Sequence, residues 1–184
     1  MRLIIVIVLL VNAACVSADH AGGPSGSSPY NFAISYPDEW KRLDTERFLI
    51  ITKDGRPFSQ YIMAQQRHVD KPFGHTAQVL KREMLPLDAA EIIVKEIQSD
   101  KSVLDFKIAE IVPAKVGGYN GFRMVFFYKI EKGYKFKSIY YGFLIGEWFY
   151  TLRFNASEKY FLEKDIETFH RVLNSFKILK KKTS

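Results

Sequence analysis

The feature that most constrains this fold is a series of four apolar segments in the second half of the chain, separated by very short turns. The segments are predicted strands at about residues 106–115, 122–131, 134–145 and 148–155, and each separator contains glycine. Connections this short join neighbouring strands as antiparallel hairpins, because a parallel crossover needs a dozen residues or more. The sequence therefore predicts a four-stranded antiparallel meander.

Both faces of this sheet are predicted to need cover. In the strand from Phe122, the side chains of Phe122, Met124 and Phe126 point one way, while Val125 and Phe127 point the other way. Side chains alternate between the two faces of a strand, so both faces are apolar near its centre. Neither face is suited to lie bare in water.

The first half of the chain predicts three further antiparallel strands. Phe32 and Ile34 alternate with smaller or polar residues over 31–36, and strands at 48–53 and 59–68 flank an Asp54-Gly55 turn. An Asp-Gly pair supplies the positive φ that a tight reversal needs.

Helices are predicted at three places. A first piece covers 76–85, Pro86 opens a second helix that runs to about residue 99, and Ser157 caps a third helix that runs to about 175. Strands, then helices, then strands and a final helix indicate an α+β fold, with the antiparallel sheet sandwiched by helices in three α/β/α layers.

The first residues predict export from the cytoplasm. An apolar run at 3–11 follows Arg2, and its nine residues reach about half way across a bilayer, which favours a signal peptide over a membrane span. Two cleavage sites compete. One precedes Cys15, where Asn12-Ala13-Ala14 resembles a lipobox apart from Asn12, and Cys15 would then carry the lipid. The other follows Ala18.

These features divide the chain into four parts. Residues 1–18 are the predicted signal peptide, which ends at 14 in a lipoprotein, and residues 19–29 are a Gly/Ser/Pro-rich tether. Residues 30–178 form one domain, and 179–184 form a basic tail. Cys15 is the only cysteine, so no disulfide can form within the domain.

Several packing motifs resemble the PsbP-like superfamily. They are Phe32-x-Ile34-x-Tyr36-Pro37-x-x-Trp40, Gly118-x-x-Gly121-Phe122-Arg123, the strands at 140–145 and 148–152, and Phe169-x-x-Val172-Leu173-x-Ser175-Phe176. Members of this superfamily include extrinsic photosystem subunits, a Ran-binding nuclear import factor, and bacterial exported proteins or lipoproteins of unassigned role. The resemblance spans about residues 30–178 and implies an antiparallel sheet between helices and a non-catalytic docking role.

The sequence predicts no catalytic, cofactor-binding or metal-binding residue. His68, Asp70 and His75 lie near one another in the chain, but two histidines without a fixed offset are typical of a solvated loop, so whether they bind metal stays open. There is no Gly-x-Ser-x-Gly turn, and the only thiol is that of Cys15. An enzyme is therefore not the favoured interpretation.

Two basic regions offer sharper alternatives. The aromatic residues between 134 and 154 are interleaved with Lys135, Lys137 and Arg153, which suggests a base-stacking surface. Alternating aromatics in strands favour a core instead, and we expect no nucleic-acid partner.

Lys177 and the lysines at 180–182 form a basic run near the C-terminal end of the sequence. They are interpreted as a solvated end, with attraction to anionic lipid or wall polymer as the alternative.

Three functions follow, in order of preference. The first is an exported domain, periplasmic or membrane-anchored in the cell envelope, that binds another envelope protein and catalyses nothing. The second is a carrier of a small or lipid-like ligand, held between the sheet and the 76–99 helices. The third is a hydrolase. The net charge of +7 permits anionic partners without identifying one, and the oligomeric state is left open.

Overall fold

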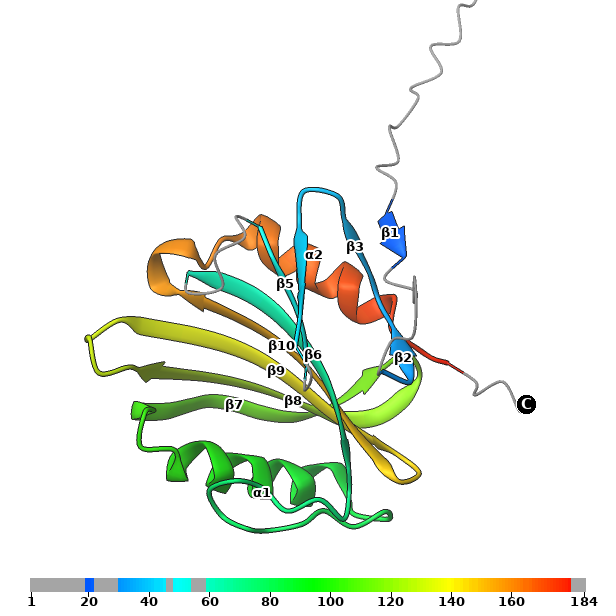
Figure 1. Ribbon diagram of the computed structural model, residues 1–184. Helices are drawn as coiled ribbons and strands as arrows, with labels where there is room; N and C mark the ends of the chain where they lie inside the picture. The colour runs from blue at the N-terminus through cyan, green and yellow to red at the C-terminus, as the bar shows by residue number, and fades with distance from the viewer. Residues whose placement is uncertain (1–18, 22–29, 46–47, 54–58, 180–184) are drawn as a thin grey trace, which may run out of the picture.

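The computed structural model describes residues 19–21, 30–45, 48–53 and 59–179. Within these residues, seven strands form one antiparallel sheet in the order β4-β5-β6-β10-β9-β8-β7, and two α-helices accompany it in an α+β fold (Figure 1). The strands are β4 (Lys41–Asp44), β5 (Leu49–Thr52), β6 (Gln60–His68), β7 (Leu104–Val116), β8 (Tyr119–Lys129), β9 (Lys135–Ile145) and β10 (Trp148–Ser157). The helices are α1 (Pro86–Ser99) and α2 (Glu163–Asn174).

The predicted meander is confirmed, since β7, β8, β9 and β10 are consecutive antiparallel neighbours. The β7–β8 turn depends on glycine, because Gly117 and Gly118 have φ values of 54° and 89°, which L side chains rarely adopt. The earlier hairpin joins the meander through β6, which pairs with β10 from His68 opposite Trp148 to Gln60 opposite Ala156.

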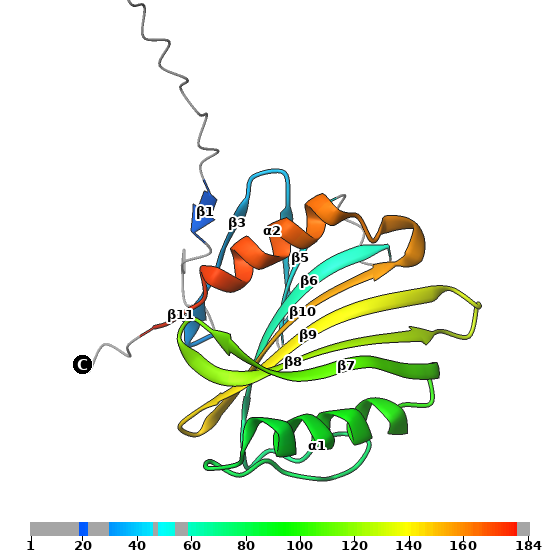
Figure 2. The same ribbon diagram turned by 180° about the vertical axis from the view of Figure 1, so that it is seen from behind.

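Side chains on the two faces of the sheet form two separate cores. The α1-side core contains Phe122, Met124 and Phe126 of β8 with Ala89 and Ile93 of α1. The α2-side core is built on the other face and includes Val125 of β8, Phe143 of β9, Tyr150 and Phe154 of β10, Phe169 of α2 and Phe176. Figures 1 and 2 show α1 and α2 on different sides of the sheet, with α1 contacting β7, β8 and β9. The prediction that both faces are apolar near the centre is thus confirmed.

The strand predicted at residues 31–36 is present as two short antiparallel strands that lie outside the main sheet. They are β2 (Phe32–Ala33) and β3 (Ser35–Pro37), which pair with β11 (Lys177–Ile178) and β1 (Asp19–Ala21), respectively. The reason is the α2-side core, in which the side chains of Phe32 and Ile34 are buried. The backbone N–H of Ser35 donates to Ser175 Oγ at 2.8 Å, which ties β3 to the end of α2. Strand β4 pairs with β5 in the main sheet instead.

Residues 76–85 are a loop, and the helix predicted there is absent. Ala77 has a positive φ of 54°, which an α-helix excludes. Leu80 is buried in the α1-side core, and its N–H donates to the carbonyl oxygen of Val69. Tertiary packing therefore overrides the helical pattern. The second helix begins at Pro86, as predicted.

The last helix begins later than predicted. Ser157 makes no side-chain capping bond and leads only into η1, a short 3₁₀ turn (Glu158–Tyr160), and α2 starts at Glu163. Phe161 breaks the helix because its ring packs on Phe154 at 5.4 Å between centroids, with Lys137 Nζ 4.3 Å from the ring centre. The buried stripe of α2 is nevertheless as expected at Phe169 and Leu173.

Candidate ligand-binding groove

A large groove lies at one end of the sheet, where β6 and β9 begin and β8 and β10 end. Antiparallel pairing brings these four strand ends together, and the β8–β9 turn and η1 extend beyond them, at the left of Figure 1. The groove has a volume of about 1260 Å³. We call it the end groove. It is lined by Ser59, Tyr61, Ser102, Tyr128, Ile130, Glu131, Lys132, Gly133, Tyr134, Lys135, Phe136, Asn155, Ser157, Glu158, Lys159 and Tyr160.

Strand register positions the polar side chains of this region. Asn155 of β10 lies opposite Tyr61 of β6 and opposite Ser138 of β9. One step further along, Phe136 of β9 lies opposite Tyr128 of β8. Residues opposite one another share a face of the sheet, and Tyr128 and Phe136 belong to the α1-side core. The groove therefore opens on the face that carries α1, at the end of the sheet.

Five aromatic side chains line the end groove: Tyr61, Tyr128, Tyr134, Phe136 and Tyr160. Tyr134, in the β8–β9 turn, has 59% of its surface exposed, and Tyr160 of η1 has 37% exposed. Among the described residues, the hydroxyls of Tyr61, Tyr134 and Tyr160 have no hydrogen-bond partner. Rings that are accessible on a face and carry free hydroxyls can stack on a flat ligand and hydrogen-bond to it.

Arg153 lies next to the groove and contacts two of its lining residues. Its Nη2 donates to Tyr128 Oη at 3.2 Å, to Asn155 Oδ1 at 3.0 Å and to Ser138 Oγ at 3.0 Å. Tyr128 and Ser138 also donate to Asn155 Oδ1. The guanidinium carbon is 5.1 Å from the centre of the Phe126 ring. Within the described part of the chain, no carboxylate forms an ion pair with this arginine.

The charge on Arg153 is favoured by its surroundings. Burial opposes the charged form, but the phenols of Tyr61, Tyr128 and Tyr140 outweigh burial and raise the arginine pKa. Burial also raises the pKa of Tyr128, and it raises the pKa of Tyr140 to about 12. Tyr128 and Tyr140 therefore stay neutral near pH 7 and serve as hydrogen-bonding groups rather than bases.

The charged residues at the groove comprise three lysines and two glutamates: Lys132, Lys135, Lys159, Glu131 and Glu158. Lys135 Nζ lies 4.0 Å from Glu158 Oε2, so these two charges largely offset each other. The positive charges of Lys132, Lys159 and Arg153 then exceed the single negative charge of Glu131. The local field is therefore positive.

His68 and His75, which the sequence left open as metal ligands, contact different carboxylates. His68 contacts Asp70 at 3.5 Å through Nδ1 and Glu147 at 3.6 Å through Nε2, whereas His75 contacts Asp100 at 3.6 Å. In residues 19–21, 30–45, 48–53 and 59–179 there is no group of three or more His, Cys, Asp or Glu side chains that could hold a metal ion. Cys15 lies outside the described residues.

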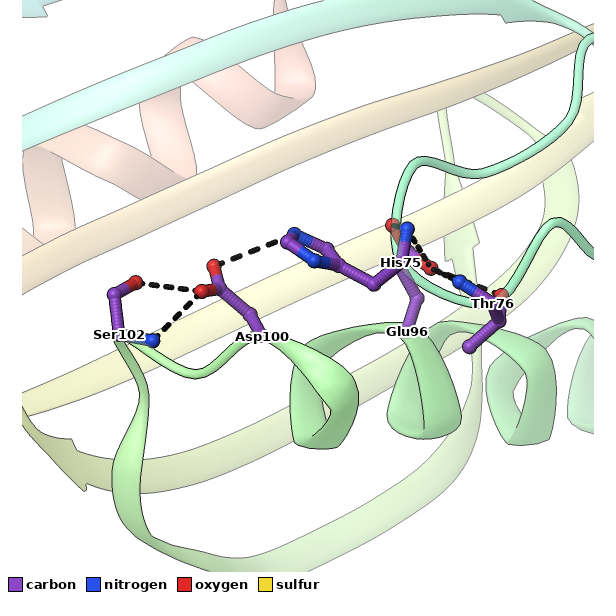
Figure 3. A network of polar contacts seen from close by, with 5 residues as sticks. All are labelled: His75, Thr76, Glu96, Asp100 and Ser102. Atoms are coloured by element: carbon purple, nitrogen blue, oxygen red, sulfur yellow. Dashed lines mark hydrogen bonds and ion pairs between the residues drawn. The ribbon is translucent and has the colours of Figure 1, made fainter.

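His75 belongs to a loop anchor rather than to the end groove. Figure 3 shows Glu96 of α1 accepting the backbone N–H groups of His75 and Thr76, at 3.0 and 2.9 Å, while Asp100 accepts from Ser102. Burial would raise the pKa of Glu96, but the hydrogen bonds from His75 and Thr76 outweigh it and lower the pKa. The hydroxyl of Ser102 lowers the pKa of Asp100. Both carboxylates hold backbone in place.

Comparison with known proteins identifies the fold, although the sequence similarity is low. No protein-family model and no curated protein matches the sequence. Among solved structures, cyanobacterial PsbP (CyanoP) of Synechocystis sp. PCC 6803 matches with a TM-score of 0.58 and 10% identity, over 80% of this chain and 86% of that protein. The chain has a PsbP-like fold. At this identity, the likeness of the PsbP-like domain to CyanoP shows the fold alone.

Two further structures share the PsbP-like architecture. LpqN of Mycobacterium tuberculosis, described as involved in cell envelope biogenesis, matches with a TM-score of 0.54 and 15% identity, over 81% of this chain and 83% of LpqN. A protein of Bacteroides thetaiotaomicron VPI-5482 matches with a TM-score of 0.50 and 12% identity, over 82% of this chain. The match covers only 46% of the Bacteroides protein, so this chain spans less than half of it.

Sequence reasoning missed the end groove of this PsbP-like domain. A signal was present on β10, where Thr151, Arg153 and Asn155 alternate with the core residues Leu152 and Phe154. A polar stripe on a strand whose neighbours are apolar on both faces indicates a site for polar groups. The core interpretation of the aromatic segment is confirmed for its strand residues, but Tyr134 is exposed in the turn.

Proposed function

We propose that this chain is an exported, non-catalytic binding domain of the cell envelope, and that it holds its partner in the end groove. The observation that carries the proposal is the groove itself, at about 1260 Å³, lined by rings and free hydroxyls. This volume exceeds the range of about 300–1,000 Å³ that is usual for small-molecule sites. The scaffold behind it is, in our interpretation, a three-layer α/β/α sandwich.

Location in the envelope rests on two supports. The leader pattern at residues 1–18 predicts export, with Cys15 as the residue that would carry a lipid anchor. LpqN, which shares the fold, is described as involved in cell envelope biogenesis. Neither α1 nor α2, the α-helices of the described residues, is long and apolar enough to cross a bilayer.

A non-catalytic role is supported by the chemistry of the groove. The phenols beside Arg153 have raised pKa values, so they remain protonated near pH 7. The lining residues include hydroxyls, rings, lysines and glutamates, and we infer that they bind a partner without reacting with it.

Lipid carriage between the sheet and the 76–99 segment has less support. The cavity in that position, bordered by Met84, Ala89 and Phe149 among others, has a volume of about 200 Å³. That is below the usual range for a ligand site, and the side chains of the α1-side core occupy the surrounding space. The end groove is the better site.

Docking of another envelope protein is a second candidate, favoured by an apolar patch beside η1. Phe127 has 37% of its surface exposed and Leu162 has 43% exposed. Lys137 lies over the rings of both Phe127 and Phe161 and so joins the patch. This patch suits a protein surface better than a soluble ligand.

Site-specific photocrosslinking in the cells that make the protein tests the proposal. A photoreactive benzoylphenylalanine in place of Tyr134 reports on the end groove, and the same residue in place of Phe127 reports on the patch. Tyr119 is the matched control, because it is also 37% exposed but lies at the start of β8, away from the groove-lining residues. We expect adducts at position 134 only. Adducts at 127 alone would favour protein docking, and adducts at neither would contradict both.

A further inference from the structure

The charges and rings of the end groove together indicate the class of its partner. We propose, on the basis of the function proposed above, that the end groove binds an anionic glycan, a chain of sugar rings that carries carboxylate or phosphate groups. Three features of the groove support this: its rings, its uncompensated positive charge and its volume.

The rings suit sugars because a pyranose has a flat, apolar C–H face. Tyr134, in the β8–β9 turn, and Tyr160, in η1, both line the groove and are exposed. Aromatic faces stack on such surfaces, and a tyrosine adds a hydroxyl at its edge. The hydroxyl of Tyr61 is free among the described residues and can bond to a sugar hydroxyl.

The positive charge suits acidic groups. Arg153 is held by the neutral acceptors Tyr128, Ser138 and Asn155, and no carboxylate of the described residues pairs with it. A partly buried cation without a counterion is favoured by any anion that comes near. Lys132 adds to this charge in the β8–β9 turn, since no ion pair joins it to another described residue.

The size suits a polymer rather than a single sugar. At about 1260 Å³, the groove has room for several sugar rings, and it lies at an end of the sheet rather than beneath a helix. An acidic peptide without aromatic or proline residues would satisfy the charge, but it offers no ring face to Tyr134 or Tyr160.

Calorimetric binding measurements test the proposal with three defined probes. The protein is the full chain, expressed with its own leader and purified after export. The probes are an oligogalacturonate, which has carboxylated pyranose rings, a malto-oligosaccharide of the same length, which is neutral, and an oligoglutamate of the same charge. We expect the oligogalacturonate to bind most tightly, and higher salt to weaken it because the charges are exposed.

Paired variants locate the binding. Tyr134→Ala removes one ring, and we expect it to weaken oligogalacturonate binding by about fivefold. Lys132→Gln removes one charge and should weaken binding by about threefold. The controls are Tyr119→Ala and Lys95→Gln, because both residues are exposed and neither lines the groove. The controls should bind as the unaltered protein does, and thermal unfolding verifies that every variant is folded.

Each alternative result overturns the inference. Equal binding of the malto-oligosaccharide would remove the anionic requirement, and equal or tighter binding of the oligoglutamate would remove the sugar. No binding of any probe would reject the glycan class. If no probe binds, the crosslinking experiment separates the two proposals. Adducts at position 134 would then support a binding function with another class of partner, whereas the absence of adducts would contradict the binding function as well.

Discussion

At the scale of single residues, Arg153 decides the character of the groove end of the sheet. One guanidinium connects Tyr128, Ser138 and Asn155, which come from three different strands. Ser138 and Asn155 are almost fully buried, so each needs a hydrogen-bond partner inside the protein. The arginine is therefore both a structural link and the source of positive charge beside the groove.

Removal of this link should destabilise the protein. Arg153→Met keeps much of the side-chain volume but leaves buried oxygens with one donor fewer, so we expect the free energy of unfolding to fall by about 1–3 kcal/mol. Urea denaturation followed by circular dichroism measures it. Lys95→Met, on the exposed face of α1, is the control and should change little. Equal midpoints for the two variants would mean that the link contributes nothing.

Tyr140 makes the free energy of unfolding depend on pH in the alkaline range. Burial raises its pKa from 10.0 in the unfolded chain to about 12 in the folded protein. Between these values the unfolded chain loses the phenolic proton while the folded protein keeps it, so stability is full below pH 10.0 and falls as pH rises toward about 12. Tyr140→Phe should reduce this fall in denaturation curves measured at several pH values in that window. An identical pH dependence in the variant would contradict the assignment to Tyr140.

At the scale of elements, the long loop between β6 and α1 is held by the helix that follows it. Glu96 of α1 accepts from the N–H groups of His75 and Thr76 and from the Thr76 hydroxyl. Leu80, in the same loop, is buried in the α1-side core. The loop therefore covers part of the sheet without being a helix.

Loss of the Glu96 carboxylate should loosen this loop alone. In Glu96→Ala, the N–H groups of His75 and Thr76 lose their acceptor, so their amide hydrogen exchange should become at least several-fold faster. Hydrogen-exchange mass spectrometry of peptides that cover residues 69–85 measures this. Glu91→Ala, at an exposed position of the same helix, should exchange like the unaltered protein. Acid should act in the same direction, because protonation through the lowered pKa of Glu96 weakens its acceptor strength.

Strand β9 contains a glycine that close packing requires. A Cβ on Gly142 would lie 2.5 Å from Cζ of Phe122 and 2.8 Å from Cζ of Phe149, two rings that stack at 6.4 Å between centroids. Gly142→Ala should therefore lower the free energy of unfolding by about 1–3 kcal/mol through overpacking. Gly74→Ala is the control, since its nearest atom would be 3.8 Å away. Equal unfolding temperatures for the two variants would show that the rings move aside without cost.

At the scale of the whole molecule, the proposed binding groove lies apart from the region where the described chain ends meet. Strand β3 and the end of α2 lie together at the side where the described N-terminal and C-terminal residues meet, because Leu179 N–H donates to the carbonyl of Asn31. The end groove lies where β8 ends and β9 begins, beyond α1. A chain attached through its N-terminus would thus keep the groove accessible.

Export has a direct test at this scale. We expect mass spectrometry of the protein from its own cells to find a mature N-terminus at a lipid-modified Cys15 or at Asp19. The first result requires the protein in the membrane fraction, and the second requires it outside that fraction. A chain that retains Met1 and stays in the cytosol would contradict the leader prediction and the envelope location with it.

Features that depend on local spacing could be predicted from the amino-acid sequence alone. Hairpin strands of the meander, the start of α1 at Pro86 and the buried residues Phe169 and Leu173 of α2 follow from short turns and from periods of two and of three to four residues. Such patterns involve neighbours in the chain, so they can be seen without coordinates.

The meeting points of distant segments, in contrast, depend on how the chain packs in three dimensions. The placement of β2 and β3 beside α2, the loop held by Glu96 and the gathering of Tyr61, Tyr128 and Asn155 in one groove all depend on contacts between residues far apart in the chain. Polar residues at such meeting points have no periodic signature, because strand register and packing bring them together. The candidate site therefore emerged only when the sheet was assembled.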